Sequence, residues 1–199
     1  MKNIVLFGDS ICFGAPEACP PSPGYGIYVK ERLEGSAAVY LPRENCRFAY
    51  YTLRYAHEWA KDMPRDDVDV VHWNNGLWDV LRLFGDDPFT DLDSYGAALK
   101  RIYKRIRLLF PNAKVIFALS TSVKEEWASH DFFRCNRDIE LYNEKAIEVL
   151  SEFQVEFNDL YSITRSFDDS MRSDWVHYGE GGSSVLADAV IEKCLEVMK

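Results

Sequence analysis

The sequence lacks the features of a disulfide-rich secreted protein, of a membrane-spanning protein and of a nucleic-acid-binding protein. Cysteine is scarce: the five residues are an odd number without CxxC spacing, which fits reduced thiols better than a disulfide framework or a zinc site. They are Cys12, Cys19, Cys46, Cys135 and Cys194. No apolar run approaches the roughly 20 residues needed to cross a bilayer. The 23 basic residues are outnumbered by 32 acidic ones, and the net charge of −9 argues against nucleic acid as a partner.

Signals for export and for a cofactor are also missing. Met1 and Lys2 run directly into an apolar segment, which leaves no room for the separate regions of a signal peptide, so we expect a cytoplasmic protein. There is no metal-ligand spacing and no glycine-rich phosphate cradle, so we expect neither a metal nor an organic cofactor. The 199 residues contain no repeat or linker and predict one domain over 1–199, with the oligomeric state left open.

What is present is a regular alternation of short apolar runs with longer amphipathic segments. The predicted strands cover residues 4–7, 37–41, 67–73, 114–119 and 155–160. The predicted helices cover residues 27–33, 50–61, 91–110, 137–153 and 182–198, with Ser94 as the N-cap of the third. Loops are expected at 12–26, 74–79, 120–135 and 162–173. Strands alternating with helices imply one parallel sheet covered on both faces, so we predict a three-layer α/β/α fold.

The opening stretch carries the first candidate for chemistry. Residues 4–7 form a continuous apolar run, as in a strand buried on both faces. Gly8 allows a sharp turn, and Asp9 and Ser10 follow it directly. Ligands bind at the carboxyl ends of strands in parallel α/β sheets, so the Ser10 hydroxyl is a candidate nucleophile. The alternative is a serine that only caps or turns the chain.

The segment before the last predicted helix carries the second candidate. Within residues 173–179, Asp174 and His177 are three positions apart, a spacing that puts both side chains on one side of a turn. A carboxylate beside an imidazole holds one ring nitrogen as a donor and leaves the other free to accept a proton. A serine hydroxyl needs such a base to become a nucleophile. Alternatively, the Asp-x-x-His pair forms only a local hydrogen bond or a helix cap.

The two candidates are expected to meet, because the last helix must pack back against the sheet near the first strand. Gly8-Asp9-Ser10 together with Asp174-x-x-His177 resembles the SGNH, or GDSL, hydrolase family, and the similarity covers essentially the whole chain. The resemblance implies a five-stranded parallel sheet in a flavodoxin-like order. It also implies that Ser10 is the nucleophile, His177 the base and Asp174 the residue that orients the base.

The same resemblance implies an oxyanion hole built from the N–H of Ser10, an N–H after the second strand and an Asn after the third. Residues 44–48 correspond to the family's segment after the second strand, where Cys46 or a neighbour takes the position of the family's glycine. In the segment after the third strand, Trp78 aligns with the Asn that the family usually has. Asn74 or Asn75, just upstream, supplies the amide instead. The pattern Asn-x-Gly-Leu-Trp-Asp resembles a divergent branch of the family and favours Asn74. The alternative is that both Asn residues only shape a turn.

Aromatic and charged residues near the same edge are candidate substrate contacts. The predicted set is Asp9, Arg47, Trp78, Asp79 and Trp127. Trp78 and Trp127 offer flat apolar surfaces that could stack on a sugar ring, although packing is the commonest fate of aromatic residues. Arg47, and likewise Arg134, could bind a carboxylate or a phosphate, with a surface ion pair as the alternative.

The expected function is that of a serine esterase that transfers a small acyl group, such as acetyl on a carbohydrate, to water. The short loops rich in glycine and proline favour a small acyl group over a long lipid chain. The alternatives are a non-catalytic binding module with the same fold, a lipase- or thioesterase-type acyl hydrolase, and a flavodoxin-like nucleotide or phosphate binder. Asp9 in the first loop would repel an anion, which argues against the last of these.

Overall fold

The computed structural model describes residues 1–18 and 21–199, so the predicted thiol Cys19 and Pro20 of the first predicted loop lie outside the described residues. The strands are β1 (Lys2–Phe7), β2 (Ala37–Tyr40), β3 (Val70–Trp73), β4 (Arg82–Leu83), β5 (Lys114–Ala118), β6 (Phe132–Phe133) and β7 (Val155–Asn158). The α-helices are α1 (Ser10–Phe13), α2 (Tyr25–Arg32), α3 (Ala49–Trp59), α4 (Leu92–Leu109), α5 (Asn136–Leu150), α6 (Leu160–Arg165) and α7 (Glu180–Val197). Short 3-10 turns cover Ala60–Asp62, Arg65–Asp67, Glu125–Trp127 and Asp169–Met171.

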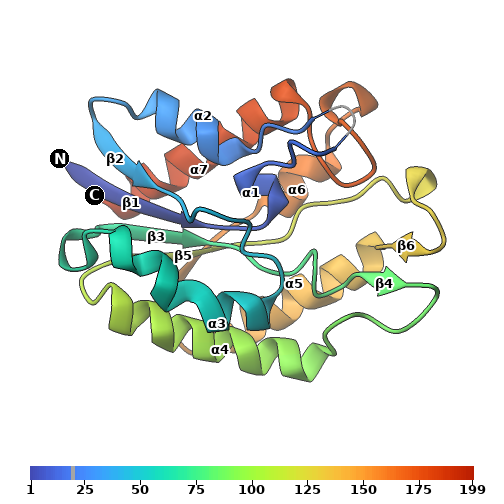
Figure 1. Ribbon diagram of the computed structural model, residues 1–199, viewed down its shortest axis with the longest axis horizontal. Helices are drawn as coiled ribbons and strands as arrows, with labels where there is room; N and C mark the ends of the chain where they lie inside the picture. The colour runs from blue at the N-terminus through green and yellow to red at the C-terminus, as the bar shows by residue number, and fades with distance from the viewer. Residues whose placement is uncertain (19–20) are drawn as a thin grey trace.

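The main sheet of the described chain has five parallel strands in the order β2-β1-β3-β5-β7 (Figure 1). β1 pairs with β2 on one side and with β3 on the other, so that Val5 lies between Tyr40 and Val71. Helices α3, α4 and α5 cover one face of the sheet, and α1, α2, α6 and α7 cover the other (Figure 1). The predicted three-layer fold and flavodoxin-like strand order are therefore confirmed.

The apolar patterning explains why the sheet lies between two helical layers. Residues 4–7 of β1 have no exposed surface, as expected of a central parallel strand covered on both faces. The stripe of α4 that packs inward includes Leu99, Ile102 and Ile106, each without exposed surface. In the part of the chain that the structure describes, no helix is both long and apolar enough to cross a membrane.

Capping aspartates explain where α1, α4 and α6 begin. Asp91 rather than Ser94 caps α4, because its carboxylate accepts the Ser94 N–H at 2.9 Å. Asp9 caps the short helix α1 in the same way. Asp159 caps α6 by accepting the Ser162 N–H at 3.0 Å, where the sequence predicts the end of a strand and a loop. A well-placed cap thus starts a short helix where the apolar pattern gives no signal for one.

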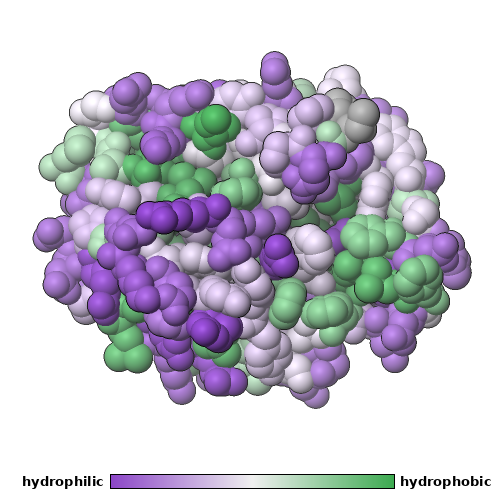
Figure 2. All heavy atoms as spheres, viewed as in Figure 1, coloured by the Kyte–Doolittle hydropathy of each residue, from purple (hydrophilic) through white to green (hydrophobic). Residues whose placement is uncertain are grey.

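β4 and β6 form an antiparallel ribbon that the sequence does not predict. Arg82 lies opposite Phe133, and Leu83 lies opposite Phe132. Strands this short are below the length at which an alternating pattern can be recognised. The ribbon lies beyond the carboxyl ends of the main strands (Figure 1), and Figure 2 shows an apolar patch over it. The patch includes Leu83, Phe84 and Phe132, which are 36%, 79% and 40% exposed.

The carboxyl ends of β1, β3 and β5 lie at one edge of the molecule, beside α1 and the ribbon (Figure 1). The turn from β1 into α1 depends on Gly8, since an added Cβ would lie 2.5 Å from the Cβ of Cys12. A residue without a side chain therefore lets α1 begin directly above the end of β1. This turn sets Ser10 at the edge where the other loops converge.

Candidate active site

Ser10, His177 and Asp174 form a hydrogen-bonded row at the carboxyl edge of the sheet. Ser10 is the first residue of α1 and is 7% exposed. The His177 Nε2 lies 2.9 Å from the Ser10 Oγ, and the His177 Nδ1 lies 2.7 Å from the Asp174 Oδ2. With the imidazole proton on Nδ1, His177 donates to Asp174 and accepts from the Ser10 hydroxyl. The structure thus brings together the three residues that the sequence singles out from its two ends.

The Asp174 carboxylate is fixed by its own loop. Its Oδ1 accepts the backbone N–H groups of Val176 and His177, each at 2.7 Å. Burial alone would raise the pKa of Asp174, but hydrogen bonds from His177 and Val176 outweigh it and lower this pKa to about 2. The carboxylate is therefore ionised at neutral pH, and it holds the imidazole ring in one orientation.

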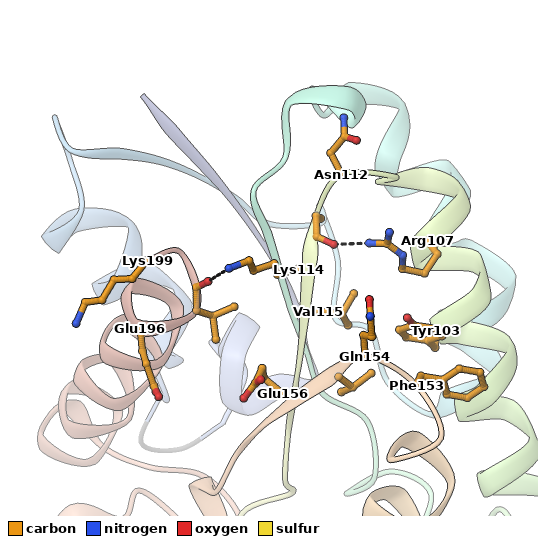
Figure 3. A pocket seen from close by; sticks show the side chains of 13 residues that line it. Tyr103, Arg107, Asn112, Lys114, Val115, Phe153, Gln154, Glu156, Glu196 and Lys199 are labelled. Atoms are coloured by element: carbon orange, nitrogen blue, oxygen red, sulfur yellow. Dashed lines mark hydrogen bonds between the residues drawn. The ribbon is translucent and has the colours of Figure 1, made fainter.

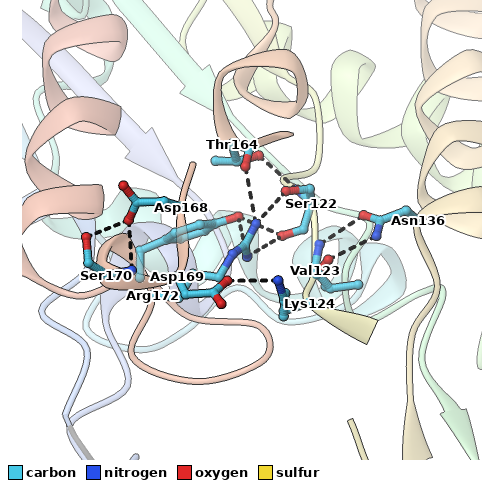
Figure 4. Close-up of polar contacts among 10 residues, drawn as sticks. Ser122, Val123, Lys124, Asn136, Thr164, Asp168, Asp169, Ser170 and Arg172 are labelled. Carbon is cyan, nitrogen blue, oxygen red and sulfur yellow. Dashed lines mark hydrogen bonds and ion pairs between the residues drawn. The ribbon is translucent and has the colours of Figure 1, made fainter. Parts of the chain in front are cut away.

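Arg172 and Tyr178 fasten both ends of the base loop, residues 173–177, to the segment after β5. Figure 4 shows the contacts of Arg172 with Ser122 and Thr164. The Arg172 guanidinium donates to the Ser122 Oγ at 2.9 Å and to the Ser122 carbonyl at 3.2 Å. It also donates to the Thr164 carbonyl at 3.2 Å. The Tyr178 hydroxyl donates to the same Ser122 carbonyl at 2.6 Å, and the guanidinium lies 5.0 Å from the Tyr178 ring centroid. The base loop is thereby held against the sheet.

The loop after β2 uses the Cys46 N–H in a way that the sequence does not predict. That N–H donates to the Gly8 carbonyl at 3.0 Å, and Cys46 has no exposed surface. The next residue, Arg47, has a left-handed backbone with φ of 51°, and its N–H donates to the Asn45 Oδ1 at 2.8 Å. The Cys46 N–H, predicted as an oxyanion donor, is instead bonded to the Gly8 carbonyl and ties this loop to the end of β1.

Asn74 and Asn75 differ in whether the side-chain amide has a hydrogen that is not used in a hydrogen bond. The Asn75 Nδ2 donates to the Arg47 carbonyl and to the Thr52 hydroxyl, each at 2.9 Å, so both of its hydrogens are used. The Asn74 Nδ2 makes one hydrogen bond within the described chain, to the Ala118 carbonyl at 2.8 Å. Asn74 thus retains a donor near the site, whereas Asn75 connects two loops.

Comparison with known proteins identifies the family. Residues 6–185 match the GDSL-like Lipase/Acylhydrolase family, a span that contains both Ser10 and His177. The chain belongs to this family. It is accordingly an ester hydrolase. No curated protein matches the chain significantly.

Solved structures share the fold of this GDSL-like chain. A lipase/acylhydrolase from Enterococcus faecalis superposes with a TM-score of 0.73 at 20% identity, over 97% of this chain and 95% of that one. A carbohydrate esterase family 3 protein from Talaromyces cellulolyticus gives 0.70 at 18% identity, over 100% and 98% of the two chains. An acetyl xylan esterase gives 0.71 at 18% identity, over 96% and 98%. At these identities the similarity shows the fold and leaves the substrate open.

Two predicted substrate contacts of the GDSL-like chain, Asp9 and Asp79, lie in its interior. Asp9 is 1% exposed, and its Oδ1 accepts the Ile11 N–H at 3.0 Å, which caps α1. Asp79 has no exposed surface, and both of its oxygens lie 3.1 Å from the Ala49 N–H at the start of α3. Burial raises the pKa of Asp9, and it raises the pKa of Asp79 to about 7. Both carboxylates organise helix starts, so each has a structural partner within the protein.

The other three predicted contacts lie nearer the surface. Trp78 is half-buried, and Trp127 is 46% exposed. The Lys124 Nζ lies 5.7 Å from the centre of the Trp127 ring. Arg47 is exposed and lies over the Tyr51 ring, 5.0 Å from its centroid. Trp78 shares the neighbour Arg134 with Trp175 of the base loop. Trp127 shares Lys124 with the same loop, since the Lys124 N–H donates to the Trp175 carbonyl at 2.7 Å.

Trp175 is a site residue that the sequence patterns do not single out. Its ring lies 5.2 Å from the Arg134 guanidinium, and the Trp78 ring lies 5.8 Å from the same group. Its position in the chain, directly after Asp174 and two residues before His177, is the signal that could have identified it.

Another place that could hold a ligand lies away from this edge. A cavity of about 780 Å³ lies at the amino ends of β5 and β7 (Figure 3). Two cations on its wall are bonded to the backbone: Arg107 donates to the Ala113 carbonyl, and Lys114 donates to the Val197 carbonyl. Within residues 1–18 and 21–199, no three His, Cys, Asp or Glu side chains are grouped so as to hold a metal ion.

Proposed function

We propose that the protein is a serine esterase that hydrolyses small acyl esters, with acetylated carbohydrates as its substrate class. The observation that carries the proposal is the hydrogen-bonded row from Asp174 through His177 to Ser10. It lies at the strand ends where α/β proteins bind their ligands. A nucleophile, a base and a residue that orients the base are the parts that acyl transfer through serine requires.

Ser10 is the nucleophile in the proposed reaction. The His177 Nε2 takes the hydroxyl proton while the Ser10 Oγ bonds to the ester carbonyl carbon, and the ionised Asp174 stabilises the imidazolium. The tetrahedral intermediate collapses when His177 gives this proton to the leaving alcohol, which leaves an acyl group on Ser10. Water then attacks the acyl carbon with His177 again as the base. The acid is released, and the hydroxyl of Ser10 is restored.

The proposed oxyanion hole contains the Ser10 N–H and the Asn74 amide. The first N–H groups of a helix have no partner within that helix, so the Ser10 N–H at the start of α1 is placed to donate. The Asn74 Nδ2 has one hydrogen left after its bond to the Ala118 carbonyl. We leave out Cys46 and Asn75, because their donors are committed to other groups.

A small acyl group and a sugar are favoured by the loops and the surfaces around the site. The loop after Ser10 is rich in glycine and proline, which favours a small acyl group over a long chain. Trp78 and Trp175 provide flat rings on which a sugar could stack. Structural neighbours described as a carbohydrate esterase and as an acetyl xylan esterase lend further support.

A panel of esters tests the proposal. The protein would be assayed with acetyl, butyryl and octanoyl esters of 4-nitrophenol and with acetylated xylo-oligosaccharides, beside Ser10→Ala. We expect the fastest turnover on acetyl esters, no turnover by Ser10→Ala, and labelling of the wild type alone by a fluorophosphonate. Binding of the sugar acetate without turnover or labelling would make the protein a binding module. A preference for octanoyl esters would make it a lipase-type hydrolase.

A further inference from the structure

We propose that Arg134 forms an anion-binding subsite beside Ser10 and selects esters that carry a carboxylate close to the scissile bond. The inference rests on the proposed esterase function and adds the chemical class of its substrate. Arg134 directly follows β6, and its side chain lies at the carboxyl edge of the sheet, between the base loop and the loop after β3.

An aromatic cage holds the Arg134 guanidinium in place. Its Cζ lies 5.8 Å from the ring centroid of Trp78, 5.3 Å from that of Phe132 and 5.2 Å from that of Trp175. The three rings come from three separate segments of the chain, and Arg134 is 3% exposed. Guanidinium groups are attracted to ring faces. The cage therefore fixes the position of the cation without using its hydrogen-bond donors.

Most of the donors of Arg134 are unused. The Nε donates to the Leu77 carbonyl. Apart from residues 19 and 20, which are not described, neither Nη1 nor Nη2 has a hydrogen-bond partner in the protein. Leu77 lies three residues after Asn74, so this bond anchors Arg134 to the loop that carries the proposed oxyanion amide. A pair of N–H donor groups is thus left between this loop and the base loop.

The neighbouring carboxylates do not bond to this pair of donor groups. Burial lowers the pKa of Arg134 to about 10, against the opposing charges of Asp9 and Asp174, so the group is a cation at neutral pH. Asp174 gives its oxygens to the base loop. The Asp9 Oδ1 accepts the Ile11 N–H, and its Oδ2 has no partner among the described residues. The two acids thus lie near Arg134 without accepting hydrogen bonds from its two terminal nitrogens.

A carboxylate is the ligand that these donors fit. Donors that the protein leaves unused are open to an acceptor from a ligand. A carboxylate presents two oxygens to the two terminal nitrogens of a guanidinium, which gives strong and directional hydrogen bonds. On the proposed acetyl esters this carboxylate stands on the alcohol part, and a carboxylate on the acyl part is the alternative position that the experiment tests beside it.

Two matched pairs of esters separate these positions. The alcohol-side pair is 4-acetoxybenzoate and 4-acetoxybenzamide, and the acyl-side pair is methyl hydrogen succinate and methyl succinamate. The members of each pair have nearly the same shape and differ in charge. Each ester would be assayed with the wild type, Arg134→Met, Arg134→Lys and Arg54→Met. Arg54 is the matched control, because it also lies over an aromatic ring, 4.9 Å from Tyr55, but its side chain is 61% exposed on α3.

The expected result is a loss of charge selectivity in the Arg134 variants. The wild type and Arg54→Met should prefer the carboxylate of at least one pair by roughly 10- to 100-fold in kcat/KM. Arg134→Met should remove this preference, because its kcat/KM should fall much more on the carboxylates than on the amides. Arg134→Lys should keep part of the preference, since it retains the charge without the planar pair of donors. Thermal melting of each variant checks that the fold is intact.

Three results would overturn the inference. They are a wild type without preference in either pair, a preference that persists in Arg134→Met, and an equal fall on carboxylates and amides in that variant. Failure of the esterase proposal looks different, because then the wild type hydrolyses none of the four esters. Calorimetric titration of 4-acetoxybenzoate and 4-acetoxybenzamide into wild type and Arg134→Met would in that case still decide whether Arg134 binds the anion.

Discussion

The His177 Nε2 lies 2.9 Å from the Ser10 Oγ, although 167 positions separate the two residues in the chain. The contact forms because α7 packs against α2 and β3 on the face of the sheet that also carries α1. Both ends of the chain therefore reach one edge. A proton can pass between these two side chains without any rearrangement of the loops.

Removing either partner of this contact should abolish turnover. We expect kcat of Ser10→Ala and of His177→Ala to fall on the order of 10⁴-fold or more, because each loses the proton transfer that activates the nucleophile. Ser166→Ala is the matched control, since Ser166 is exposed and its hydroxyl bonds to the Ile163 carbonyl. Initial rates on 4-nitrophenyl acetate provide the measurement. A Ser10→Ala rate within about tenfold of wild type would refute the assignment.

Alanine at Asn74 should lower the catalytic rate, whereas alanine at Asn75 should lower the stability of the fold. Asn74→Ala loses the remaining amide donor, so we expect its kcat to fall about 100-fold. Asn75→Ala leaves the Arg47 carbonyl and the Thr52 hydroxyl without their donor, so we expect a loss of about 2 kcal/mol in unfolding free energy. Rates and urea unfolding of both variants measure this difference. If instead Asn75→Ala lost kcat and Asn74→Ala lost stability, the oxyanion amide would be assigned to Asn75.

The fold and the catalytic row could be predicted because they have local signatures. A continuous apolar run such as residues 4–7, followed at once by a glycine, is typical of a buried strand, and the structure places it in the centre of the sheet. Ser10 stands shortly after that run, while Asp174 and His177 have the spacing of a single turn. The alternation of strands and helices then leaves one edge where these residues can meet.

The hydrogen-bond partners of individual groups could not be predicted, because they depend on contacts between loops that are distant in the sequence. The Cys46 N–H is a free donor in the sequence pattern, but in the structure it bonds to the Gly8 carbonyl. Asp79 follows a strand like a site residue, yet it serves the start of α3. The cage around Arg134 combines three segments, of which the ribbon strand β6 has no recognisable pattern. Such partners are set by tertiary packing, which a single sequence does not show.

Acid should destabilise the protein through Asp174. Its pKa of about 2 lies below the ordinary value of 3.8, so its contribution to stability is present above about pH 4 and is lost as the pH falls toward about 2. The shift corresponds to about 2 kcal/mol. Asp174→Asn should therefore be less stable than wild type by about that amount near pH 6, with the difference closing near pH 2. Urea unfolding across this range measures it, and a gap that stays constant with pH would contradict the prediction.

Arg172 should act on catalysis by positioning the base loop. Lysine cannot reproduce the planar group that donates to Ser122 and Thr164, so in Arg172→Lys we expect kcat to fall about tenfold with little change in KM. The rate of fluorophosphonate labelling should fall in parallel, because it also depends on the base. Arg165→Lys, at an exposed arginine of α6, is the control. A lower melting temperature with an unchanged kcat would limit Arg172 to a structural role.

Asp79→Asn should change protein stability in opposite directions at low and at high pH. Burial raises the pKa of Asp79 to about 7 from 3.8, so its contribution is fully present below about pH 4 and is lost as the pH rises to about 7. Asparagine keeps an oxygen for the Ala49 N–H but cannot ionise, so the variant avoids the burial of a charge. We expect Asp79→Asn to melt at or below the wild-type temperature near pH 4 and above it near pH 8. Asp66→Asn, at an exposed aspartate, should show no such crossing. An Asp79→Asn protein that is destabilised at both pH values would mean that the buried carboxylate is ionised and stabilised by its hydrogen bonds.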